Sequence, residues 1–120
     1  MEIRKPKNTE ELKKYQEEYS ETKLWNKLRK FAGKLGKDLV YQVLVLYYVM
    51  KSPDVPLKTK SIIIGALGYL ILPIDLIPDV IPVLGFTDDA AAIAMAYKAV
   101  KDSITPDIEK QAHVKISEWF

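Results

Sequence analysis

The sequence predicts an all-α fold: a small bundle of about five helices, with an Asp/Pro-rich loop between the third and fourth main helices. Three observations support this class. Apolar residues recur at steps of three and four over most of the chain, which is the period of one helix face. Capping residues precede several of these stretches. Residues 39–50 are rich in Val and Tyr and could form a strand alone, but no second run offers a partner strand.

The N-terminal part is expected to form two helices. Asn8 and Glu11 have the spacing of a capping box, in which each side chain bonds a free backbone N–H. A longer helix is predicted over residues 21–50, because apolar residues follow one stripe through most of it. Gly33 and Gly36 weaken the middle of this helix, because each costs about 1 kcal/mol relative to alanine, and a kink or break is predicted there.

Residues 57–72 are predicted to form a third helix that is apolar on nearly every face. Gly65 and Gly68 lie on one side of it, and such small residues let another helix approach closely. The expected partner is a fourth helix over about residues 88–101, which carries six alanines. Thr87 is its expected N-cap.

The last helix is predicted to begin after Thr105, an N-cap residue followed by proline at the first helical position. Its expected buried stripe consists of Ile108, Ala112, Ile116 and Trp119. No linker or repeat divides the chain, so residues 1–120 are expected to form a single domain of ordinary size. Within it, residues 1–38 are expected to form basic amphipathic helices and residues 39–120 an apolar helical core.

The composition excludes several kinds of site. Hydrophobic residues make up 48% and charged residues 28%, a balance typical of a globular protein. The absence of cysteine excludes disulfides, thiolate zinc sites and cysteine nucleophiles, and leaves the redox compartment open. The net charge is only +2, so we do not expect nucleic acid as a partner. The first residues contain no apolar core, so no signal peptide is expected.

Residues 69–89, called here the signature segment, are unusually dense in proline and aspartate. Their marker residues are Pro73, Asp75, Pro78, Asp79, Pro82, Gly85, Asp88 and Asp89. The pattern Pro-Ile-Asp-Leu-Ile-Pro-Asp, then Ile-Pro-Val-Leu-Gly, then Asp-Asp resembles the YkvA-like family. That family is a bacterial domain of unknown function, also seen as a module in some larger membrane proteins. The resemblance is strongest over residues 65–100, with one departure at Thr87. It implies a helical fold, membrane association and no known catalytic residue. We expect the marker residues to have a structural role.

The aspartates of the signature segment allow three interpretations: a cation site, acid–base work, or helix caps and hydrogen bonds within the loop. Asp75 and Asp79 are one helical turn apart, which could place both carboxylates on one side. Together with Asp88 and Asp89 they could hold magnesium or calcium, or raise one carboxyl pKa for acid–base work. We favour a role in which the aspartates cap short helices and hold the loop by hydrogen bonds to its backbone. Aspartate prefers N-caps and turns, and the spacing is not that of an EF-hand. No cofactor or catalytic residue is predicted, and His113, the only histidine, is expected to be an ordinary surface residue.

Five lysines lie along one side of the predicted second helix. The members of this row are Lys23, Lys27, Lys30, Lys34 and Lys37. With Trp25 beside it, the row is typical of a basic amphipathic helix that lies on an anionic bilayer. Residues 1–38 carry 11 Lys or Arg against 7 Asp or Glu, whereas the remainder carries 7 against 9. The alternative is a solvated face of an ordinary core helix.

Three functions are compatible with the sequence. The favoured one is a non-enzymatic scaffold or accessory module that associates with an anionic membrane surface, at the cytoplasmic face or as an embedded helical hairpin. The second is a soluble cytoplasmic protein that binds a metal or ligand through its aspartates. The third is a self-associating structural domain, which would form a homo-oligomer or bind a protein partner. Residues 39–50 would span only about 18 Å as a helix, short of the ~30 Å hydrocarbon core.

Overall fold

All regular structure is helical within residues 8–76 and 82–120, the part of the chain that this computed structural model describes. The α-helices are α1 (Thr9–Leu12), α2 (Glu21–Leu35), α3 (Lys37–Lys51), α4 (Leu57–Leu76), α5 (Pro82–Ala99) and α6 (Pro106–Ser117). Two 3-10 helices, η1 (Lys13–Glu18) and η2 (Lys101–Ser103), connect them. The predicted all-α class is confirmed.

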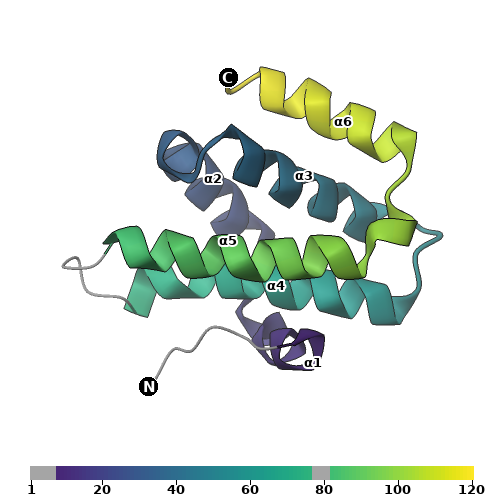
Figure 1. Ribbon diagram of the computed structural model, residues 1–120, viewed down its shortest axis with the longest axis horizontal. Helices are drawn as coiled ribbons and strands as arrows, with labels where there is room; N and C mark the ends of the chain where they lie inside the picture. The colour runs from purple at the N-terminus through teal and green to yellow at the C-terminus, as the bar shows by residue number, and fades with distance from the viewer. Residues whose placement is uncertain (1–7, 77–81) are drawn as a thin grey trace.

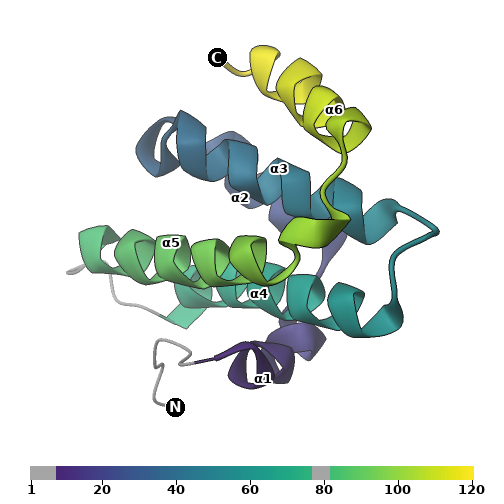
Figure 2. The same ribbon diagram turned by 45° about the vertical axis from the view of Figure 1, so that its right-hand side comes forward.

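The helices pack in layers around α4 and α5, which run antiparallel through the middle of the molecule (Figure 1). On one side, η1 lies across α4. On the other side, α3 packs against both central helices, and α6 covers the far side of α3 (Figure 2). Helix α2 contacts α3 and α4. The molecule measures 40 × 32 × 22 Å along its principal axes.

Side-chain caps begin three of the helices. The Asn8 side chain accepts a hydrogen bond from the Glu11 N–H at 3.0 Å, so the predicted start of the first helix is confirmed. Thr105 likewise accepts from the Ile108 N–H at 3.2 Å and opens α6, as predicted. Ser20 caps α2 in the same way. Each of these oxygens satisfies an N–H that has no partner inside its helix.

The predicted break in the long second helix occurs at Gly36, which has a φ of +91°. This left-handed backbone conformation suits glycine, because a Cβ would be strained there. The break separates α2 from α3, so the two can lie at an angle and contact different neighbours. Residues 39–50 belong to α3 and are helical, which confirms the preference for a helix over a strand.

The two central helices are longer at the signature segment than predicted. Helix α4 continues through Pro73 to Leu76, and α5 begins at Pro82. The predicted helix limits at residues 72 and 88 were therefore wrong. Thr87 lies inside α5 and is not its N-cap. Proline is well suited to a first helical position, which accounts for the early start of α5. The loop itself, with Pro78 and Asp79, lies outside the described residues.

One apolar core joins α2 through α6. Its largest fully buried side chains are Tyr69, Leu24, Leu28, Leu44, Leu46, Ile63, Leu67, Leu70 and Ile93. In α6, the buried stripe at Ile108, Ala112 and Ile116 is as predicted, and Trp119 is half-buried against it. Alternation of buried and exposed positions along α6 thus follows the helical period.

Gly68 is a point of close backbone approach, but its partner differs from the prediction. A Cβ on Gly68 would collide with the carbonyl oxygen of Tyr15 and lie 3.3 Å from the Tyr19 nitrogen. The neighbour is therefore η1, and the expectation that Gly68 receives the alanine-rich helix was wrong. Gly65 is buried, and α5 still packs along α4. The small residue at position 68 allows the N-terminal segment to cross α4 at backbone distance.

Candidate functional site: the basic face of helix α2

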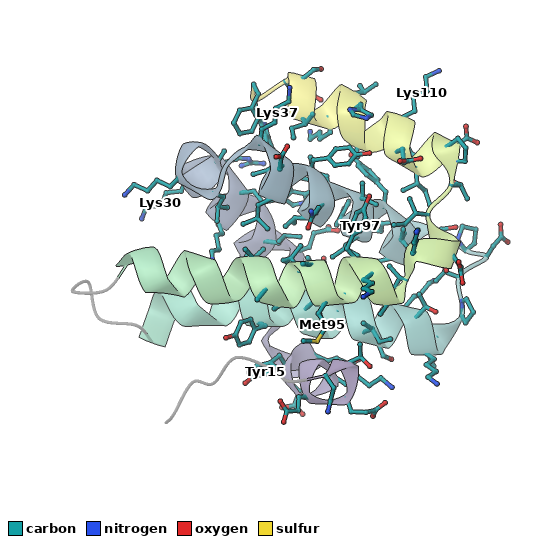
Figure 3. The ribbon with its side chains drawn as sticks, in the orientation of Figure 1. Tyr15, Lys30, Lys37, Met95, Tyr97 and Lys110 are labelled. Carbon is teal, nitrogen blue, oxygen red and sulfur yellow. The ribbon has the colours of Figure 1, made fainter. Side chains whose placement is uncertain are left out.

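Helix α2 has one side buried in the core and one side facing solvent. Leu24 and Leu28 are fully buried and Leu35 is nearly so, which fixes the helix on α3 and α4. The exposed cations form what we call the basic face: Lys23, Arg29, Lys30, Lys34 and Lys37. Lys30 points away from the bundle at its edge (Figure 3). The basic face is thus presented by a helix whose orientation is set by its leucines.

Lys27 is an exception to the predicted row. Only 5% of it is exposed, and its Nζ donates a hydrogen bond to the backbone carbonyl of Leu70 in α4. This corrects the expectation that Lys27 lies with the other lysines on a membrane-facing surface. A lysine stem can pack along apolar surface, and its position at the α4 side of the helix brings the amino group to a carbonyl. The row of five is therefore a row of four exposed lysines with one buried member.

Trp25 also lies differently from its prediction as a membrane-facing residue. It is half-buried in an aromatic cluster formed by Trp25, Tyr47, Tyr48 and Trp119. Its ring lies edge-on to Tyr47 at 4.9 Å and to Trp119 at 5.8 Å between centroids. Lys115 Nζ lies 5.5 Å from the Trp25 centroid, within cation–π range. The cluster joins α2 to α3 and α6. Lys115 was not predicted, because no local spacing relates residues so far apart in sequence.

Glu21, at the start of α2, is engaged with the end of α3. Tyr47 Oη donates to Glu21 Oε1 at 2.6 Å, and Lys51 Nζ lies 2.9 Å from the same oxygen. The hydrogen bond from Tyr47, followed by that from Lys51, lowers the pKa of the Glu21 carboxyl below its ordinary value of 4.5. The same contacts raise the pKa of Lys51. Because Glu21 is paired with Lys51, it is oriented toward α3 rather than along the basic face.

This pairing predicts a small loss of stability in acid. A lowered carboxyl pKa stabilises the folded state above pH 4.5, and that contribution disappears as the pH falls through the folded-state pKa. Since both side chains are about half exposed, we expect no more than about 0.5 kcal/mol. Urea denaturation at pH 7 and pH 3.5 should show that Glu21→Gln narrows the difference between the two pH values. Glu17→Gln, at an exposed position on η1, should leave that difference unchanged. If Glu21→Gln changed the free energy of unfolding by the same amount at both pH values, the pairing would be contradicted.

Tyr19 is a half-buried phenol near this network. Among the residues that the structure describes, its Oη has no hydrogen-bond partner. Burial, with smaller contributions from Glu21 and Tyr47, raises the pKa of Tyr19 to about 12. The phenol therefore stays protonated at neutral pH and is not suited to act as a general base.

A shallow hollow of about 500 Å³ lies where α2 meets α3, beside α5. It is lined by Leu35, Gly36, Lys37, Asp38, Leu39, Gln42, Ala90 and Ala94. Helix α3 begins here without a side-chain cap, so its partial positive charge adds to that of Lys37. Asp38 in the first turn offsets part of it. The hollow marks the end of the basic face.

The predicted carboxylate cluster is only partly within the described structure. Asp75 falls in the last turn of α4, and Asp88 and Asp89 fall in α5, as do Pro82 and Gly85. The side chains of these residues, and all of Asp79, lie outside the described residues. Elsewhere in the described ranges, no group of three or more His, Asp or Glu is placed to hold a metal ion. That the signature aspartates act as caps and do not bind a cation therefore stays a prediction. His113 is exposed, and its ring lies 4.6 Å from that of Tyr41.

Comparison with known proteins identifies the region around the signature segment. Residues 59–95 match the family described as "Protein of unknown function (DUF1232)". A curated relative, the "Uncharacterized membrane protein YkvA" of Bacillus subtilis (strain 168), is 38% identical over 53 residues. These matches support assignment of this chain to the YkvA-like family.

The alignment covers 44% of this chain and half the length of the relative. No solved structure matches the chain. In the part of the chain that the structure describes, none of the helices has the length and apolar character needed to cross a membrane.

Proposed function

We propose that this YkvA-like chain is a non-enzymatic, membrane-associated module that rests α2 on an anionic bilayer surface and serves as a scaffold or accessory protein. The observation that carries the proposal is the basic face, five exposed cations on and just after one firmly anchored helix. The name of the relative, a membrane protein, supports association with a membrane.

The expected interaction is weak and reversible. Each cation close to an anionic leaflet contributes about 1 kcal/mol, and the attraction falls off within a Debye length of about 8 Å at physiological salt. The basic face could therefore contribute up to about 5 kcal/mol, comparable to a single lipid anchor. Trp25 is packed in the aromatic cluster, so it does not add an apolar anchor. Binding should then be dominated by electrostatics and sensitive to salt.

Peripheral contact is favoured over an embedded hairpin by the packing of the central helices. Helix α4 is covered by η1 on one side and by α3 on another, and its residues from Ile62 to Ile71 are largely buried against protein. An embedded hairpin would have to exchange these contacts for lipid. The basic face, by contrast, is accessible without any rearrangement.

Vesicle binding tests the proposal directly. The variant Lys23→Gln/Lys30→Gln/Lys34→Gln should lose at least tenfold in binding to vesicles of mixed phosphatidylcholine and phosphatidylserine at low salt. It should keep its helical content, because glutamine is a fair helix former. Wild-type binding should fall on adding salt and be weak on pure phosphatidylcholine. Lys27 is left unchanged because it is buried.

A matched control removes the same charge elsewhere. Lys58, Lys101 and Lys110 are exposed on α4, η2 and α6. Lys110 lies at the opposite end of the molecule from Lys30 (Figure 3). Changing these three to glutamine should reduce binding far less than changing the basic face. If the two triple variants lost the same amount of binding to anionic vesicles, binding would depend on the net charge of the protein and not on the basic face. Equal wild-type binding to neutral and anionic vesicles would rule out the electrostatic proposal.

A further inference from the structure

Two partly exposed tryptophan rings, from α2 and from just after α6, form what we call the tryptophan corner. The rings of Trp25 and Trp119 are nearly perpendicular, with 80° between their planes and 5.8 Å between their centroids. The Nζ of Lys115 lies over both rings, 5.5 Å from the centroid of Trp25 and 5.9 Å from that of Trp119. At such distances the negative face of an aromatic ring attracts a cation. The tryptophan corner therefore already holds a positive charge, supplied by the chain itself.

A carboxylate lies beside this positive charge. Glu118 Oε1 is 3.7 Å from Lys115 Nζ, a distance at which the two charges attract without a hydrogen bond. Ring faces and a carboxylate at this range attract a cation but do not use the N–H donors of a lysine. A quaternary ammonium group has no N–H to donate, so these surroundings suit it better than they suit the amino group that is present.

A shallow hollow of about 320 Å³ adjoins the tryptophan corner, because Lys115 and Glu118 belong to both. The hollow is lined by Tyr48, Lys110, Gln111, Val114, Lys115 and Glu118. Its volume is at the lower end of the range of small-molecule sites. About a third of the Lys115 side chain is exposed, at 33%, so its flexible stem can turn away from the rings without disturbing the core.

We propose that the tryptophan corner binds quaternary ammonium groups such as that of choline, and that Lys115 occupies the site in the free protein and is displaced by the ligand. The same trimethylammonium group occurs in free choline and in the headgroup of phosphatidylcholine, so the experiment has to separate these two sources. The site does not depend on the proposed contact of the basic face with a membrane, because soluble choline tests it without a bilayer.

Tryptophan fluorescence reports on this site directly, since Trp25 and Trp119 are the only tryptophans in the chain. Lys115→Ala should bind choline about tenfold more tightly than wild type, as expected if Lys115 fills the corner about nine-tenths of the time. Dimethylbutanol, the uncharged carbon analogue of choline, should cause no saturable change in fluorescence. Equal binding of choline and this alcohol by Lys115→Ala, or no saturable change with either, would overturn the proposal.

Lys110→Ala is the matched control, because Lys110 lines the same hollow while the cation over the two rings is that of Lys115. It removes the same charge and should change choline affinity by no more than about twofold, since exposed charges are screened by solvent and salt. Equal gains in Lys110→Ala and Lys115→Ala would mean that choline responds only to charge repulsion, and would overturn the proposal.

Changes at Trp119 test the rings themselves. In the Lys115→Ala background, Trp119→Leu should weaken choline binding roughly fivefold, because it removes one aromatic face but keeps an apolar side chain. Trp119→Phe keeps a ring and should restore part of the affinity. Unchanged choline affinity in Trp119→Leu would contradict the site.

Vesicles of pure phosphatidylcholine separate the two sources of the ligand. If Lys115→Ala gains affinity for these vesicles as well as for choline, the lipid headgroup reaches the tryptophan corner. If it gains affinity for choline alone, the ligand is a free solute. Either pattern supports the site, whereas a gain on vesicles without a gain for choline would overturn it.

Discussion

Replacing Gly68 with alanine should lower the free energy of unfolding by about 3 kcal/mol, the upper end of the range for overpacked sites. The added Cβ would overlap the carbonyl oxygen of Tyr15 and lie 3.0 Å from its carbonyl carbon. Both obstacles are backbone atoms, so no rotamer change relieves the collision and η1 has to move off α4. We expect a fall in Tm of roughly 10 °C for a chain of this size, measured by circular dichroism.

Gly33→Ala is the natural comparison, because Gly33 is also helical but has no atom within 4 Å of the position of a Cβ. This variant should be more stable than wild type by up to about 1 kcal/mol, since alanine favours the helix. Limited proteolysis should also cut the Gly68→Ala protein sooner within residues 8–20. If Gly68→Ala melts at or above the wild-type temperature, the close crossing of η1 over α4 is wrong.

Leu28→Ala should destabilise the protein by about 2–5 kcal/mol, the usual range for removing a buried leucine side chain. Leu28 is fully buried, as is Leu24 one helical turn before it, at the side of α2 that faces the core. The loss combines the transfer free energy of the removed methyl groups with the cavity left behind. Urea denaturation should show a lower midpoint with little change in slope.

Leu57→Ala provides the control at an exposed site, because 78% of Leu57 is accessible to solvent. Its effect should stay within about 0.5 kcal/mol. The pair also bears on the basic face, whose direction depends on the leucines beneath it. A Leu28→Ala protein as stable as the Leu57→Ala protein would show that α2 is not anchored as described.

Local patterns in the sequence were sufficient for most of the fold. The caps at Asn8 and Thr105 and the break at Gly36 depend on residues within one or two turns, so their physical causes are visible in a short window. The ends of α4 and α5 were misplaced because two prolines were taken as helix breakers. Pro82 instead occupies a first helical position, and α4 tolerates Pro73 in its interior.

The predicted site was wrong where residues distant in sequence come into contact. The lysine row has a regular helical spacing, yet one member, Lys27, is buried because α4 lies over that side of α2. Trp25 could not be assigned to the aromatic cluster from its neighbours in sequence, since Tyr47 and Trp119 belong to other helices. Spacing identifies which residues share a helix face, but only tertiary packing determines which part of that face meets water.

The N-terminal third packs against residues that come later in the sequence, so it cannot form its native contacts early in synthesis. Tyr15 and Lys27 meet positions 68 and 70, which a ribosome adds only after α2 and α3 are complete. Until then, Leu24 and Leu28 of the nascent chain have no α4 to cover them. Such a delay exposes apolar surface during translation and slows folding through loop closure. We expect the nascent chain to expose these leucines until α4 has emerged.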